Sequence, residues 1–173
     1  MKVIPEKWVR LPEYGDPGRL LVTLVGGEEE IPLLVEAENV PVKSVTLGTE
    51  QEFEIWLEDA DEIKLYKDER DYYAGRTSSF AAESLIPCGT FPAGEDPGFV
   101  PSDTAIVQGR VTEICQDPVS LGFADGELPF VIQCLGYEFG VFARNANEYL
   151  KSIAVDNIIS GLFWVFGWPK EDE

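Results

Sequence analysis

Apolar and polar residues alternate along much of the chain with a period of two, which predicts strands. Phe53, Ile55 and Leu57 alternate with glutamates and with Trp56. Successive side chains of a strand point to opposite faces, so the first three are expected to face a core. Trp56 is then expected on the solvent face among carboxylates, and a further short strand is expected at 62–66.

Two runs rich in branched residues flank a pair of glycines near the start of the chain. They predict a hairpin of residues 20–25 with residues 29–36. A two-residue glycine turn is expected to join them, because such turns match the twist of paired strands. The preceding residues 1–17 carry prolines and are compatible with an edge strand that ends near Leu11.

The last third of the chain holds the most complete set of strand signals. Residues 105–115 form one strand-like run, and residues 128–144 hold two more. A polar, helix-compatible link at 145–153 leads to the aromatic run 157–168. The order is strand, strand, strand, link, strand, which predicts an all-β protein with one short helix or helical link.

Periodicity fades between the two strand-rich parts. We therefore expect an N-terminal β unit at 1–70, a connector at 71–103 and a C-terminal β unit at 104–173. Glycines and prolines punctuate the connector. A short helix is expected around 79–85, where a serine could cap a run with two alanines.

The two β units show a weak internal echo at an offset of 110 residues. This offset lays residues 20–55 on residues 130–165, and Phe53 then meets Phe163. There are five identities in these 36 pairs, where average composition gives roughly two. The echo favours a structural duplication, and similar alternation in unrelated strands is the other interpretation.

Five strands with a helical or loop insert before the fourth resemble the OB-fold type of small barrel. The resemblance covers 104–168 and, less completely, 20–66, with Gly109 in the first strand able to permit the coiling of a closed barrel. It implies two OB-like antiparallel β-barrel or sheet units and carries no function. The fifth strand of the second unit is missing or supplied from elsewhere.

The chain is strongly acidic, with 32 acidic and 13 basic residues and a formal net charge of -19. Phosphate binding depends on clustered Lys and Arg, so nucleic acid is not an expected partner. No apolar stretch approaches the length of a signal peptide or a membrane span, so we expect a cytoplasmic protein without a membrane partner.

Histidine is absent, which removes serine–histidine and cysteine–histidine catalysis and imidazole-based zinc sites. The cysteines Cys88, Cys115 and Cys134 lack metal-type spacing and are interpreted as buried reduced thiols. A disulfide between Cys115 and Cys134 would require neighbouring strands. No cofactor or metal site is predicted.

The final strand leaves almost no polar position, so both of its faces are expected to be covered, as in a central strand. The functional interpretation is that Trp164, Phe166 and Trp168 face outward as an aromatic patch for a protein partner or a second copy. Trp56, near the duplicate position, could extend that patch.

The second candidate surface is acidic and includes Asp59, Asp61 and Glu62. A solvated face that aids solubility is the simpler interpretation. The sharper hypothesis is a surface that docks a basic partner or imitates nucleic-acid phosphate. A calcium site is disfavoured, because the spacing of these acids lacks the glycine and terminal glutamate of an EF-hand loop.

The resulting hypothesis is a non-catalytic acidic protein that acts as a protein–protein interaction or inhibitor/immunity-type module. The alternative is a small-ligand binder or enzyme that uses Asp and Glu in a cleft between the β units. Self-association through the terminal strand is a third interpretation.

Overall fold

The fold is almost entirely β in a computed structural model that describes residues 1–13, 17–74, 80–88, 102–115, 118, 122–124, 126–144, 146, 148 and 150–170. The described strands are β1 (Lys2–Arg10), β2 (Gly18–Val25), β3 (Ile31–Ala37), β4 (Gln51–Asp59), β5 (Lys64–Tyr66), β6 (Ser84–Cys88), β7 (Thr104–Ile114), β8 (Leu128–Cys134), β9 (Tyr137–Ala143) and β10 (Ile158–Pro169). One short helix, α1 (Glu69–Tyr73), and the 3-10 turns Val42–Ser44 and Leu150–Ser152 accompany them. The predicted all-β character is confirmed.

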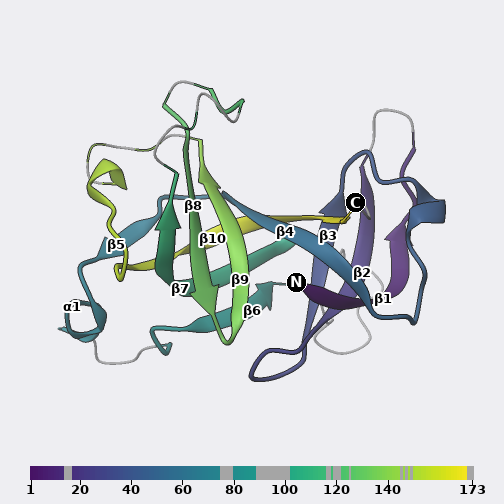
Figure 1. The fold of residues 1–173 in the computed structure, drawn as a ribbon, viewed down its shortest axis with the longest axis horizontal. Helices are drawn as coiled ribbons and strands as arrows, with labels where there is room; N and C mark the ends of the chain where they lie inside the picture. Colours follow the sequence, from purple (N-terminus) through teal and green to yellow (C-terminus); the bar gives the residue numbers. More distant parts are fainter. Residues whose placement is uncertain are drawn as a thin grey trace.

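These strands form one mixed sheet that closes in a ring, in the order β5-β10-β3-β2-β1-β4-β9-β8-β7-β6, with further pairings of β10 to β4 and to β7. Most neighbours are antiparallel, but β3 with β10 and β4 with β9 are parallel pairs. In Figure 1, β1, β2 and β3 lie at the right, β7, β8 and β9 lie to the left of them, and β4 and β10 run between these two groups, with β5 and α1 at the far left.

The pairings form two closed circuits that share β4 and β10. The first circuit runs β1-β2-β3-β10-β4 and back to β1, and the second runs β7-β8-β9-β4-β10 and back to β7. Each circuit therefore takes three strands from its own half of the chain and a fourth and fifth from the shared pair. Neither half closes without a strand from the other.

The registers of the two circuits are related by an internal pseudo-twofold. In the β4–β10 pair, Ile55 faces Gly167 and Leu57 faces Val165. Adding 110 to the β4 residue number and subtracting 110 from the β10 residue number converts the first pair into the second. The same operation maps the pair of Trp56 and Phe166 onto itself. The parallel pairs do not keep this offset, because Trp56 pairs with Gly140 whereas Phe166 pairs with Glu36 rather than with residue 30. The 110-residue echo thus matches a structural relationship at β4 and β10.

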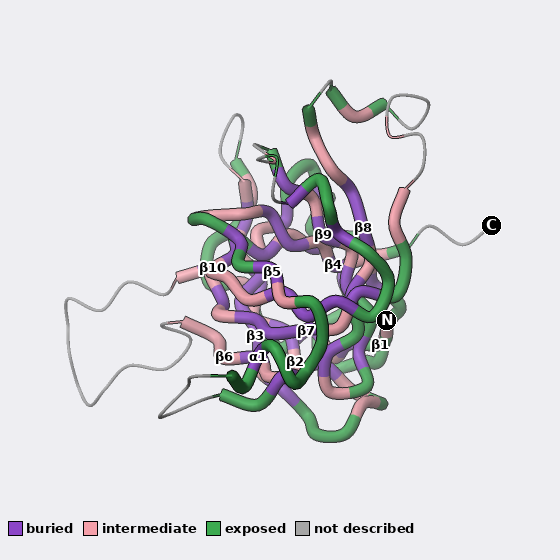
Figure 2. Tube along the Cα trace, turned by 90° about the vertical axis from the view of Figure 1, so that its left-hand side faces the viewer, coloured by how far each residue is buried: buried purple, intermediate pink, exposed green. Residues whose placement is uncertain are grey.

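The core lies inside the ring, where alternate strand residues point. Phe53, Ile55 and Leu57 are buried, as the alternation predicts, and Phe163 and Val165 of β10 are buried beside them. Figure 2 shows buried stretches along the strands around this interior and exposed stretches in many of the connections. The opposite faces of β4 and β10 therefore point away from the core.

Two local predictions were wrong. Ser84 and Leu85, the end of the helix expected at 79–85, belong to β6, which pairs with β7. The helix α1 begins earlier, where the Asp68 carboxylate accepts a hydrogen bond from the Asp71 amide. The hairpin of β2 and β3 exists, but residues 26–30 join its strands rather than two glycines. β1 pairs with β2 along its length, and only Lys2 and Val3 also pair with β4.

This longer hairpin connection packs on the turn between β8 and β9. The Glu28 amide donates to the Leu135 carbonyl at 2.9 Å, and the Tyr137 hydroxyl donates to the Glu29 carbonyl at 2.7 Å. A Cβ on Gly27 would lie 2.5 Å from the Tyr137 ring, so a residue without a side chain is needed there. The turns of the two halves therefore contact each other directly.

The remaining predictions concern the connector and the cysteines. Much of the predicted 71–103 connector, including 75–79 and 89–101, lies outside the described residues. The three cysteines are free thiols. Cys115 lies beside Pro129 at one end of β8, whereas Cys134 ends β8 at the other. At roughly 3.3 Å per residue they are too far apart for a disulfide.

Candidate functional site

The outward face of β4 and β10 carries three rows of side chains, which we call the β4–β10 ladder. The central row is Trp56 opposite Phe166, and the next row is Glu54 opposite Trp168. The Ala60 amide donates to the Leu162 carbonyl at 3.0 Å, which continues the register beyond the printed pairs. Facing residues lie on the same side of a sheet. The third row is therefore Glu58 opposite Trp164.

An open groove of about 1450 Å³ lies at the Trp168 end of the ladder. Its walls are the connection from β3 to β4, the start of β4 and the end of β10. We call it the acidic groove, and it is lined by Glu38, Asn39, Val40, Pro41, Ser44, Glu50, Gln51, Glu52, Glu54, Trp168, Pro169 and Lys170.

Trp168 shares this groove with two carboxylates. Glu54 is its direct partner on β4. Glu38, in the turn that follows β3, lines the same groove. The Trp168 side chain is 37% exposed. An accessible indole thus lies in one groove with Glu38 and Glu54.

The charge of the groove is negative. Of the described residues that line it, four are glutamates and one, Lys170, is a base. Glu50 forms an ion pair with Lys2 at 2.7 Å, and both side chains are about half exposed. Glu38, Glu52 and Glu54 leave the groove a net attraction for cations, which screening by salt weakens.

The opposite end of the ladder holds an ion pair within the chain. Arg144 binds Glu58 in a fork, with Nε 2.6 Å from Oε1 and an Nη2 hydrogen bond of 2.9 Å to Oε2. Its guanidinium also lies 5.8 Å from the centre of the Phe142 ring. Burial raises the pKa of Glu58, and the Arg144 charge opposes that rise. The Trp164 end of the ladder is therefore already supplied with a cation.

The Trp56 side chain in the central row is half-buried rather than fully exposed to solvent. Its ring covers Gly140 of β9, where a Cβ would lie 2.6 Å from the indole. Phe123 packs on it with ring centres 6.1 Å apart, and Phe142 lies 5.9 Å from Phe123. These contacts hold the central row as a fixed apolar floor between the two ends.

A pair of carboxyl groups, half-buried Glu36 and buried Asp103, lies where β3 meets the start of β7. Asp103 is 1% exposed and forms an ion pair with Arg19 at 3.3 Å. Burial raises the pKa of Glu36 to about 7, and the hydrogen bond and charge of Asp103 add to the rise. A proton on Glu36 therefore supplies a donor to Asp103, whose buried carboxylate oxygens otherwise accept no hydrogen bond within the described part of the chain.

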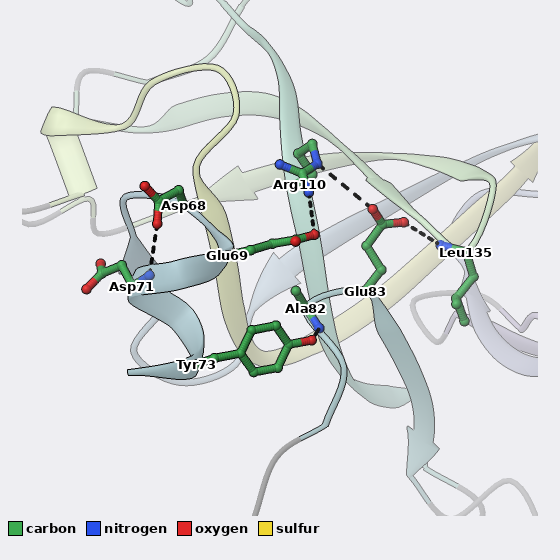
Figure 3. A network of polar contacts seen from close by, with 8 residues as sticks. All are labelled: Asp68, Glu69, Asp71, Tyr73, Ala82, Glu83, Arg110 and Leu135. Carbon is green, nitrogen blue, oxygen red and sulfur yellow. Dashed lines mark hydrogen bonds and ion pairs between the residues drawn. The ribbon is translucent and has the colours of Figure 1, made fainter. Parts of the chain in front are cut away.

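Two further polar networks are structural. Arg110 reaches Glu69 of α1 at 2.7 Å and Glu83 at 3.9 Å, and Glu83 accepts from the Leu135 amide (Figure 3). This network ties α1 and the start of β6 to the turn between β8 and β9. Separately, buried Gln108 accepts from Ser84 and donates to Ser160, with no histidine in the chain to activate either hydroxyl.

The structure brings some of the predicted site residues together. Trp56, Phe166 and Trp168 lie side by side on the ladder, and Trp164, 42% exposed, is on the same face. Full covering of both faces of the last strand is therefore wrong. The acidic candidates lie beyond the Trp164 end: Asp59 accepts from the Arg144 amide at 2.8 Å, and Asp61 and Glu62 are exposed in the following turn.

Sequence reasoning missed the groove and its carboxylates. Glu54 carried a usable signal, since it alternates with buried residues. Glu38 did not, because only the fold brings the turn after β3 into one groove with Trp168.

Comparison with known proteins gives no match to a family model, a curated protein or a solved structure. Among the described residues, no group of acidic or cysteine side chains is arranged to hold a metal ion. None of the described helices has the length and apolar character needed to cross a membrane.

Proposed function

We propose that this protein is a non-catalytic interaction module that binds a positively charged segment of a protein partner in the acidic groove. The observation that carries the proposal is the exposed indole of Trp168, which faces Glu54 on β4 and shares the acidic groove with Glu38. A cation above an indole face is attracted by the ring quadrupole, and flanking carboxylates add charge and hydrogen-bond acceptors.

The composition of the groove favours a polypeptide over a small apolar ligand. Its lining is rich in glutamate, and it is open to solvent on one side. Pockets for small molecules are mostly apolar and enclosed, whereas complementary charge steers and orients protein partners. The fixed aromatic floor of Trp56 and Phe166 extends the contact away from the groove.

A partner of opposite charge fits this surface better than a second copy of the chain. Two copies each carry a formal charge of -19 and would bring like charges together. The Trp164 end, with Asp59, Asp61 and Glu62, adds further negative charge for the same partner. Because Arg144 already neutralises Glu58, this end contributes less to binding than the groove.

We also propose that the two circuits are OB-type units, each completed by the fourth strand of the other half. Support comes from the five strands of each circuit and from the 3-10 turns, Val42–Ser44 and Leu150–Ser152, that precede the fourth strands β4 and β10. This arrangement would supply the fifth strand that the sequence lacks.

The test is titration of a fluorescently labelled octa-lysine peptide, followed by anisotropy at several salt concentrations. We expect binding that weakens as salt rises, and a loss of affinity of about ten-fold in a variant with both Glu38→Gln and Glu54→Gln. Glu113→Gln, which neutralises an exposed acid on β7, is the single-charge control and should change affinity little. Equal losses per removed charge in both variants would contradict a localised site.

A further inference from the structure

The Trp164 end of the ladder shows how this surface holds an arginine. Arg144 directs two nitrogen atoms to the two oxygens of Glu58, at 2.6 and 2.9 Å, while its guanidinium lies over the ring of Phe142. A planar guanidinium can satisfy a carboxylate with its edge and an aromatic ring with its face at the same time. Three neighbouring positions make up this row: Phe142, Glu58 and Trp164.

The pseudo-twofold relates that row to the row at the acidic groove. Glu58 corresponds to Trp168, and Trp164 corresponds to Glu54, because the residue numbers in each of these pairs differ by 110. A β4 acid opposite a β10 aromatic residue at one end of the ladder therefore recurs at the other end. Both rows therefore offer a carboxylate and an aromatic ring, the two groups that a guanidinium needs.

The chain supplies an arginine to the first row, because Arg144 follows Phe142 by two residues. In the acidic groove, Val40 is 5% exposed. Among the described residues that line the groove, the one base is Lys170, whose backbone amide donates to the Glu52 carbonyl at 2.9 Å, and none carries a guanidinium.

We infer that the acidic groove, which Glu38 and Glu54 line, is a recognition site for an arginine side chain of the partner, stacked on Trp168. This inference rests on the proposed function and makes it more specific. A guanidinium stacks flat on an indole and keeps its edge N–H groups free for carboxylates, whereas an ammonium is more strongly hydrated and lacks the planar fork. The groove is therefore expected to prefer arginine to lysine at equal charge.

The experiment compares labelled octa-arginine and octa-lysine peptides at one ionic strength, with wild type, Trp168→Ala and Trp164→Ala. We expect octa-arginine to bind wild type roughly three-fold or more tightly than octa-lysine. Trp168→Ala should abolish that preference, and Trp164→Ala should retain most of it. Trp168→Phe, which keeps a ring, should give an intermediate preference and guards against a folding defect in the alanine variant.

The outcomes separate this inference from the proposed function. Equal affinity for both peptides, with both weakened by neutralising Glu38 and Glu54, would overturn the arginine preference and leave the binding of basic segments standing. A preference for arginine that survives in Trp168→Ala would also overturn the inference. Binding of neither peptide would overturn both.

Discussion

Trp56 of β4 and Phe166 of β10 face each other at the centre of the pseudo-twofold, where both circuits of the sheet share their strands. On one side of this pair lies the row of Glu58 and Trp164, where Arg144 provides a cation. On the other side lies the row of Glu54 and Trp168, which opens into the acidic groove. The same two strands thus build the core with one face and the candidate binding surface with the other. Stability and binding can therefore be tested by separate substitutions on a single strand pair.

Gly140→Ala is expected to destabilise the protein by about 1–3 kcal/mol, because a Cβ there would overlap the indole of Trp56. Urea denaturation followed by circular dichroism measures the loss. In a Trp56→Ala background the overlap is gone, so the same substitution should cost little. An equal cost in both backgrounds would show that Trp56 does not cover Gly140.

Arg144→Ala is expected to lower the free energy of unfolding by about 2 kcal/mol, because it leaves the buried Glu58 carboxylate without its partner. Adding Glu58→Gln should restore most of the loss, since the neutral amide needs no counter-charge. Denaturation of the two single variants and the double variant gives the coupling energy. Additive effects would contradict the ion pair.

The stability should also depend on pH through Glu36. Its pKa is about 7 in the folded protein against 4.5 in the unfolded chain, so the folded state holds the extra proton between these values. The Glu36 contribution is present below about pH 4.5, is lost as pH rises to about 7 and changes no further above that. Subtracting the pH profile of Glu36→Gln from that of wild type isolates this fall, and identical profiles would refute it.

Cys134 is expected to resist alkylation in the native protein. Burial raises the pKa of its thiol to about 12, so little thiolate forms at pH 8. Cys88 and Cys115 are half-exposed and should react first with iodoacetamide, as peptide mass spectrometry would show. Early labelling of Cys134 would mean that the edge between β8 and β9 opens readily.

Local alternation was sufficient to place the strands of both halves. Phe53, Ile55 and Leu57 face the core as their spacing predicts, because a period of two leaves one choice once a face is buried. Local sequence patterns gave the wrong secondary structure where pairing with a strand distant in the sequence determines it. Residues 84–88 include a helix-compatible start but pair with β7, and that gain overrides local propensity.

The ladder could be predicted only in part. The exposed rings of Trp164 and Trp168 follow from alternation along one strand. The groove does not, because its walls come from the connection between β3 and β4, from β4 and from β10, and no local pattern records which segments become neighbours. The helix α1 was not predicted, although Asp68, whose carboxylate accepts from the Asp71 amide, is a residue type typical of a helix N-cap.

The most direct measurement of the central claim is the nuclear magnetic resonance spectrum of the indole N–H groups during addition of octa-arginine. The chain has four tryptophans, and Trp168→Phe identifies the signal of Trp168 by its disappearance. The signal of Trp168 should shift most, that of Trp164 less, and that of Trp8, outside the ladder, least. Large shifts of Trp8 with an unchanged Trp168 signal would contradict binding in the acidic groove.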